Sequence, residues 1–183
     1  MQIENDCLKI DFGETDKQTA QAMVAEIDSK KSSLFDFFGI TKLSNKLHIT
    51  LYDDFDKFVD LINESFVRQA EFYKKQGIDR PPRKWDEYIV AKAGNGEIDM
   101  LNIELCRNKT AHKNTDLQDF LQVAVHEFVH ICHGEIITKS PLPNYLLEGI
   151  ATQLSGQKYY QLAKIDCTAE DLLHNFDDMN KSY

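Results

Sequence analysis

The segment from Thr115 to Gly134 constrains the fold of this chain more than any other. Its first four residues, Thr-Asp-Leu-Gln, have the form of a capping box, and Gly134 suits the end of a helix. The sequence therefore predicts a helix from about residue 115 to His133. Its apolar residues recur at helical spacing and predict a face buried in the protein core. These residues are Phe120, Leu121, Val123, Ala124, Phe128, Val129 and Ile131.

Two histidines and a glutamate lie within this predicted helix, in the pattern H-E-x-x-H over residues 126–130. Four residues turn an α-helix through about 400°, so His126 and His130 leave on one face, roughly 6 Å apart along the axis. Two imidazole nitrogens so placed can bind one zinc ion, and Glu127 can reach a water molecule that the metal activates. We expect His126 and His130 to be zinc ligands and Glu127 to be the general base.

A catalytic zinc ion takes three protein ligands, so a third donor is required. Glu148 follows His130 by 18 residues, in a second predicted helix that starts near Asn144 after a turn with two prolines. This turn can bring the second helix back against the first, which makes Glu148 the expected third ligand. The alternative pattern H-E-x-x-H-x-x-G-x-x-H requires a glycine at 133 and a ligand at 136, but the chain has His133 and Ile136.

The rest of the chain predicts an α+β fold with helices packed on a small mixed sheet. Strands are expected at residues 8–12, 47–52, 87–93 and 97–105, the last two as a hairpin around Gly-Asn-Gly at 94–96. Helices are expected from residue 15 or 16 to Gly39 and from residue 53 or 54 to Gly77. No internal repeat or linker divides the 183 residues, and 42% of them are hydrophobic, so we expect a single domain over 1–183.

Charge and composition exclude several classes of function. A net charge of -9 without a basic cluster opposes binding to nucleic acid. No apolar stretch is long enough for a membrane span, and no signal peptide is recognisable, so a cytoplasmic protein is expected. The four cysteines form no C-x-x-C pair, which favours reduced thiols over a cysteine-based zinc site. The sequence leaves the oligomeric state open.

These motifs resemble those of the gluzincin superfamily of zinc peptidases, in the peptidase-MA-like branch. The residues that carry the resemblance are His126, Glu127 and His130, followed by Leu147-Glu148-Gly149-Ile150-Ala151, which looks like the Glu-Gly-x-Ala segment around the third ligand of that family. The resemblance implies a zincin-like fold and hydrolysis of a peptide or protein substrate with zinc as the cofactor. Leu147 departs from the family pattern, in which many members have Asn.

A hydrogen-bond donor for the oxyanion formed during peptide hydrolysis is also expected. The candidates are Tyr159 and Tyr160, on the predicted continuation of the Glu148 helix, with Tyr145 and His133 behind them. Packing of the tyrosine rings into the core is the competing interpretation.

The predicted strand at 98–105 immediately precedes the histidine helix, so we expect it to border the cleft and pair with an extended peptide. Residues 94–106 lack the Gly-x-Met-Glu-Asn motif with which the related aminopeptidases bind a free amine. Cleavage within a chain is therefore expected rather than removal of N-terminal residues. Two alternatives stay open: hydrolysis of another amide or ester by the same site, and a binding or regulatory protein in which zinc only stabilises the fold.

Overall fold

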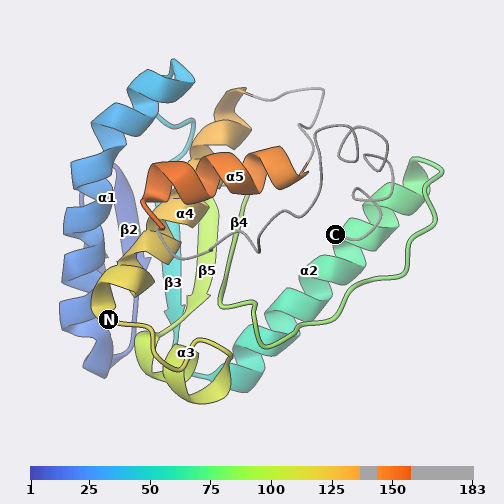
Figure 1. The fold of residues 1–183 in the computed structure, drawn as a ribbon, viewed down its shortest axis with the longest axis horizontal. Coiled ribbons are helices and arrows are strands. Elements are labelled where there is room, and N and C mark those ends of the chain that lie inside the picture. The colour runs from blue at the N-terminus through green and yellow to red at the C-terminus, as the bar shows by residue number, and fades with distance from the viewer. Residues whose placement is uncertain (137–143, 158–183) are drawn as a thin grey trace, which may run out of the picture.

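The computed structural model describes residues 1–136 and 144–157 (Figure 1). Strands and helices alternate through most of the chain, and two long helices follow the last strand. In chain order the elements are β1 (Gln2–Glu4), β2 (Leu8–Asp11), a 3₁₀ turn (Glu14–Asp16), α1 (Lys17–Phe38), β3 (Leu47–Tyr52), α2 (Phe55–Lys75), β4 (Ala91–Gly94), β5 (Glu97–Leu101), α3 (Ile103–Lys109), α4 (Leu117–Ile136) and α5 (Asn144–Ser155).

The described strands form one mixed sheet in the order β1-β2-β3-β5-β4. Strands β2, β3 and β5 are parallel, whereas β1 and β4 pair antiparallel with β2 and β5 at the two edges. The mixed α+β class predicted from the sequence is therefore confirmed. The sheet directions follow from the connections. Helix α1 carries the chain back between the parallel strands β2 and β3, whereas α2 leads to β4, and the hairpin after β4 makes β5 parallel to β3.

The main core lies between the sheet and the helices α1 and α4, which pack against each other (Figure 1). Alternate residues of β3 point into this core, where Leu47, Ile49 and Leu51 are buried. Helix α5 packs against α4. A second, smaller cluster lies where α2 meets the ends of β3 and β5; its buried residues are Tyr52, Phe58, Ile62 and Leu101.

Most predicted helix ends agree with the structure, and the cap of α4 differs by one residue. Gly39 ends α1 with φ +67°, and Asp54 caps α2 by accepting a hydrogen bond from the Lys57 N–H. At the start of α4, however, the Asp119 N–H donates to the Asp116 carboxylate, and the Asp116 N–H donates to Asp119. The reciprocal cap is thus Asp116 with Asp119 rather than Thr115 with Gln118, and α4 continues past Gly134 to Ile136.

The predicted hairpin around residues 94–96 is present, but both of its strands are shorter than expected, because β4 begins at Ala91 rather than at residue 87 and β5 ends at Leu101. Asn95 and Gly96 both have positive φ, as a tight two-residue turn requires. Strand β5 ends at Leu101 because Asn102 caps a new helix, α3, through a hydrogen bond from the Leu105 N–H. Neither α3 nor the edge strand β1 was expected from the sequence.

The prediction that residues 98–105 border the cleft and pair with a substrate peptide is wrong. Strand β5 pairs with β3 on one side and with β4 on the other, so its backbone hydrogen bonds are used within the sheet. Residues 103–105 belong to α3. The edge of the sheet next to α4 is formed by β4 instead.

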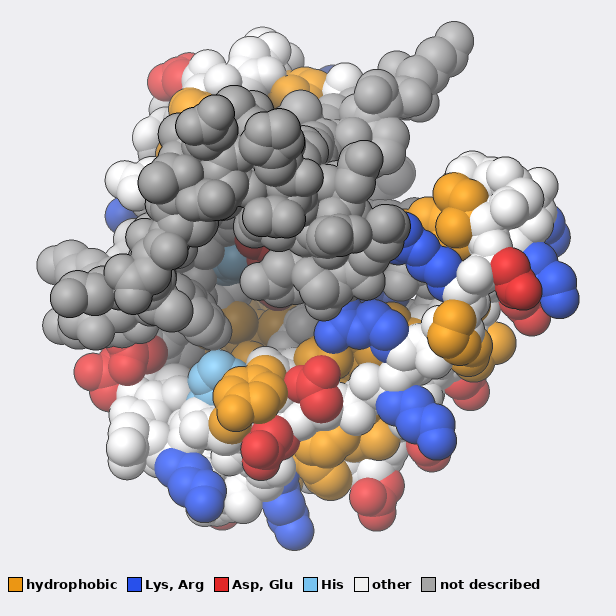
Figure 2. Space-filling view, turned by 45° about the vertical axis from the view of Figure 1, so that its right-hand side comes forward, with side chains coloured by type: hydrophobic (Ala, Val, Ile, Leu, Met, Phe, Trp, Pro, Cys, Tyr) orange, Lys and Arg blue, Asp and Glu red, His pale blue; other side chains and the backbone are white. Residues whose placement is uncertain are grey.

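The described surface carries charges of both signs. In Figure 2, Lys and Arg side chains lie among Asp and Glu side chains, and apolar side chains are exposed between them. Phe72 and Val67 on α2 are exposed apolar residues. In the part of the chain that the structure describes, no helix is long and apolar enough to cross a membrane.

Candidate metal centre

Helix α4 presents His126 and His130 on the side that faces away from the core. The helix is anchored on its other side by apolar residues, and Phe128 and Val129, which lie between the two histidines, are buried. The anchored helix fixes both imidazole rings, whose centroids are 4.8 Å apart. The two Nε2 atoms lie 3.1 Å from each other and point into the same space.

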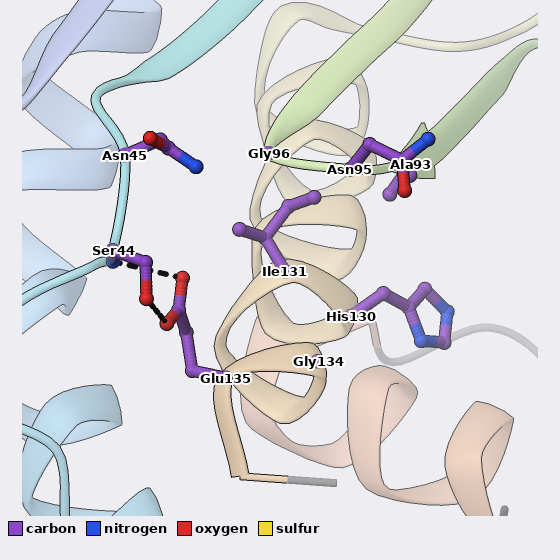
Figure 3. A pocket seen from close by; sticks show the side chains of 10 residues that line it. Ser44, Asn45, Ala93, Asn95, Gly96, His130, Ile131, Gly134 and Glu135 are labelled. Carbon is purple, nitrogen blue, oxygen red and sulfur yellow. Dashed lines mark hydrogen bonds between the residues drawn. The ribbon is translucent and has the colours of Figure 1, made fainter. Parts of the chain in front are cut away.

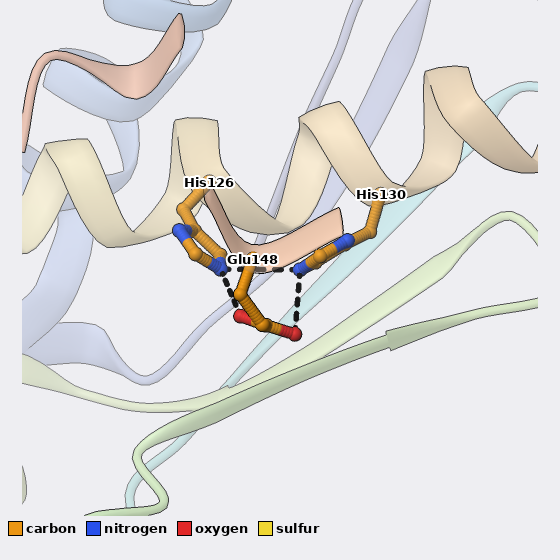
Figure 4. Close-up of side chains that lie close together, drawn as sticks. All are labelled: His126, His130 and Glu148. Carbon is orange, nitrogen blue, oxygen red and sulfur yellow. Dashed lines mark hydrogen bonds and ion pairs between the residues drawn. The ribbon is translucent and has the colours of Figure 1, made fainter. Parts of the chain in front are cut away.

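Helix α5 brings Glu148 to these nitrogens (Figure 4). Ala151 is fully buried where α5 packs on α4, and Glu148 lies one turn earlier, where it can reach across to the histidines. Its Oε2 atom is 3.1 Å from His126 Nε2, and its Oε1 atom is 3.5 Å from His130 Nε2. Residues far apart in the sequence thus form one compact cluster.

The donor atoms of His126, His130 and Glu148 suit a zinc ion in both type and spacing. One ligand atom from each residue lies within 4.8 Å of the others. In a tetrahedral site with bonds of about 2.0–2.1 Å, neighbouring ligand atoms are roughly 3.3 Å apart. The separations of 3.1, 3.1 and 3.5 Å lie close to that value. Two imidazoles and one carboxylate leave one position of a tetrahedral ion for water or substrate.

Gln157 orients His126 and was not anticipated from the sequence. Its Oε1 atom lies 2.9 Å from His126 Nδ1, so this nitrogen can donate a hydrogen bond to the amide oxygen in the tautomer that is protonated at Nδ1. The lone pair of Nε2 is then free for a metal ion, as is usual for zinc-binding histidines. Gln157 follows His126 by 31 residues and belongs to no recognised motif, so only the packing of α5 on α4 brings it into place.

Glu127 is half-buried beside the cluster, next to strand β4. Burial raises its pKa above the usual value, although His126, His130 and a hydrogen bond from the Ala93 backbone act in the opposite direction. A carboxylate whose charge is poorly solvated accepts a proton readily. The position and environment of Glu127 therefore suit a group that takes up and releases a proton.

Charge pairing couples Glu148 to the histidines. The imidazoles of His126 and His130, which lie within hydrogen-bonding distance of its carboxylate, lower the pKa of Glu148 to about 2, so it is ionised at neutral pH. Burial alone would lower the pKa of His130, but the hydrogen bond to Glu148 and the charges of Glu127 and Glu148 raise it. The cluster is thus an anionic site with donor nitrogens, which attracts a cation.

Strand β4 presents free backbone groups next to Glu127. The Leu101 N–H donates to the Val90 carbonyl at 3.0 Å, which sets the alternation of the β4–β5 ladder. In that alternation the N–H and C=O groups of Ala91 and Ala93 face away from β5. Within the described residues no strand pairs with this side of β4. An extended chain could therefore add to the sheet beside the cluster.

The other candidate residues have different outcomes. His133 is not part of the cluster; its ring lies edge-on to Phe38, and its buried Nε2 has no hydrogen-bond partner among the described residues. Burial lowers the pKa of His133, as does the nearby His130. Tyr159 and Tyr160 lie outside the described residues. Tyr145 belongs to the first turn of α5, and its role stays a prediction.

Cys7, Cys106 and Cys132 have no disulfide partner among the described residues, and Cys167 lies outside them, so the expectation of reduced thiols stays a prediction. Burial raises the pKa of the Cys132 thiol to about 12, so it is protonated at neutral pH and does not compete for a metal ion.

Comparison with protein-family models, with curated proteins and with solved structures gives no match.

Proposed function

We propose that this protein is a zinc-dependent hydrolase that cleaves peptide bonds, with His126, His130 and Glu148 as the zinc ligands. The convergence of these three side chains, with Glu127 beside them, is the observation that carries the proposal. The arrangement of a small mixed sheet, a helix with the H-E-x-x-H motif and a following helix with the third ligand supports a zincin-like fold.

The roles of the protein groups follow from their chemistry. Zinc, when bound, supplies a Lewis acid that acidifies water and polarises a carbonyl group. Glu127 accepts a proton from the attacking water and passes it to the nitrogen of the leaving amine. Gln157 keeps His126 in the tautomer that leaves Nε2 free for the metal.

The free edge of β4 favours a peptide as the substrate over a small amide or ester. An extended peptide can pair with the outward N–H and C=O groups of Ala91 and with the C=O of Ala93, and this pairing would hold its backbone next to Glu127 and the zinc ligands. Every peptide has the same backbone groups, so pairing with β4 does not by itself select a particular sequence. It therefore supports cleavage at internal peptide bonds in substrates of many sequences. This role replaces the one predicted for residues 98–105.

The proposal is tested by metal analysis and by cleavage of a defined peptide mixture. The purified protein should bind one zinc ion per chain, and mass spectrometry of the mixture should find new termini only when zinc is present. Glu127→Gln should keep its zinc and lose activity by a factor of roughly 100 or more. Glu71→Gln, which removes a charge from the exposed face of α2, is the matched control and should leave both unchanged.

Two outcomes would contradict the proposal. Unchanged turnover in Glu127→Gln would remove the general base from the mechanism. Stoichiometric zinc without cleavage of any peptide would instead indicate that the metal only stabilises the packing of α5 on α4.

A further inference from the structure

A pocket of about 530 Å³ opens beside the candidate zinc site, on the side of α4 toward its C-terminal end (Figure 3). One wall is the turn of the β4–β5 hairpin, and the opposite wall is the loop at Ser44 and Asn45. Ile131, Gly134 and Glu135 of α4 lie between the two walls. His130 lines the pocket as well, and its ring points to the other side of α4 from Glu135 (Figure 3). We call this space the side pocket.

The side pocket is joined to the proposed catalytic groups by shared residues. His130 contributes Nε2 to the metal cluster and also lines the pocket. Ala93 has an outward-facing backbone on β4 and lines the pocket as well. A peptide that pairs with β4 while its scissile carbonyl lies at the metal would therefore extend past the mouth of the pocket. A side chain of that peptide can enter it.

Glu135 gives the pocket its charge. Apart from His130, the other residues that line it are uncharged, and among the described residues Glu135 makes no ion pair. The Ser44 N–H donates to Glu135 Oε1 at 3.0 Å, and the Ser44 hydroxyl donates to Oε2. These two bonds fix the carboxylate and leave lone pairs on both oxygens for a further donor.

The direction of the pocket fits a long side chain. Glu135 follows His130 by five residues on α4, which places it roughly 7.5 Å further along the helix axis and about 140° around it. A short polar side chain that enters beside His130 does not span this distance. Lys and Arg have apolar stems that can lie along Ile131 and Gly134, and they carry a cationic group at the end.

We propose that the side pocket binds a lysine or arginine side chain of the substrate, with Glu135 as the countercharge, next to the peptide bond that is cleaved. This inference rests on the proposed peptidase function and deepens it, because it names the class of substrate. Ser44 acts as a positioning residue that holds the Glu135 carboxylate toward the pocket.

The test measures binding of zinc-directed probes, so that it does not depend on turnover. The probes are small peptide hydroxamates, whose hydroxamate group binds zinc, with lysine, arginine, norleucine or glutamate as the variable residue. Two series place this residue on opposite sides of the hydroxamate, so that either direction of the peptide on β4 is covered. Norleucine matches the stem of lysine without its charge. In one series, the lysine and arginine probes should bind about tenfold more tightly than norleucine, and glutamate most weakly.

Three variants identify the source of the preference. Glu135→Gln keeps groups that can bond to Ser44 but removes the charge, and should reduce the advantage of lysine over norleucine to less than about twofold. The control Glu71→Gln removes the same charge elsewhere and should keep the advantage. Gly134→Leu fills the pocket and should weaken the lysine, arginine and norleucine probes of that series together.

The outcomes separate this inference from the proposed function. If no hydroxamate binds the zinc-treated protein, the metal centre itself is wrong, and the inference fails with it. If all side chains bind equally while peptides are cleaved, the peptidase stands and the inference is overturned. A lysine preference that persists in both Glu135→Gln and Gly134→Leu, with zinc content and melting temperature unchanged, also overturns it.

Discussion

The amide oxygen of Gln157 lies 2.9 Å from Nδ1 of His126, on the side of the ring opposite the metal-binding nitrogen. This bond fixes both the tautomer and the orientation of the ring. Gln157→Leu should therefore weaken zinc binding by roughly 10- to 100-fold, the usual cost of losing such a partner. Competition between the protein and a chelator of known affinity measures the change.

Gln157→Glu is the informative companion to this variant. A carboxylate still accepts the Nδ1 proton and makes the imidazole more basic, so zinc affinity should equal or exceed that of the wild type. If Leu and Glu at position 157 weaken zinc binding equally, the contact does not orient His126.

A bound zinc ion should stabilise the folded protein by holding α4 and α5 together. Two ligands belong to α4 and the third belongs to α5, so an ion held by all three favours the folded state. With free zinc 1,000-fold above its dissociation constant, the gain is about 4 kcal/mol. Calorimetry with and without a chelator should show a lower melting temperature for the metal-free protein.

Glu148→Ala should remove most of this zinc-dependent shift in melting temperature, because only the two ligands on α4 remain. Full zinc occupancy and an undiminished shift in Glu148→Ala would mean that another residue is the third ligand.

Phe128 lies between the two histidines and anchors their helix in the core. It is 1% exposed, and its ring lies 6.2 Å from that of Phe35 on α1, centroid to centroid. Phe128→Ala should lower the free energy of unfolding by about 3–5 kcal/mol through the cavity it leaves. Leu117→Ala on the same helix changes an exposed side chain and should cost less than about 0.5 kcal/mol. Urea denaturation of the two metal-free variants provides the comparison.

Asp16 should make the protein less stable as pH rises from acid to neutral. Burial raises the pKa of this carboxyl, and the charges of Asp53 and Glu104 add to the effect, although the Asn102 side chain donates a hydrogen bond to it at 3.1 Å. The folded protein therefore holds the Asp16 proton more tightly than the unfolded chain. Its contribution to stability is greatest below the unfolded pKa, near pH 4, and is lost as pH rises through the folded pKa.

Asp16→Asn keeps an oxygen acceptor for Asn102 and removes the buried charge. The variant should be more stable than the wild type at pH 7, and the difference in unfolding free energy should shrink as pH falls toward 4. Urea denaturation at several pH values tests this. A difference that grows toward low pH would reverse the sign and show that the Asp16 carboxylate stabilises the fold.

Local patterns in the sequence were sufficient for several elements. The alternation at 47–52 and the Asn-Gly turn at 95–96 specified a strand and a hairpin because both depend on the backbone preferences of neighbouring residues. The strand predicted to reach residue 105 shows the limit. Ile103 and Leu105 continue the alternation, but the hydrogen bond from the Leu105 N–H to the Asn102 side chain starts a helix there.

The sequence alone determined that His126 and His130 share one face of a helix, because their spacing of four residues matches the helical repeat whatever the helix packs against. It also indicated Glu148 through its place in the next helix. Only the tertiary structure decided that β4 rather than β5 is the free edge, that Gln157 contacts His126, and that Glu135 faces a pocket beside His130. Periodicity reports which residues are buried, whereas the neighbours of a strand or a side chain depend on how distant elements pack together.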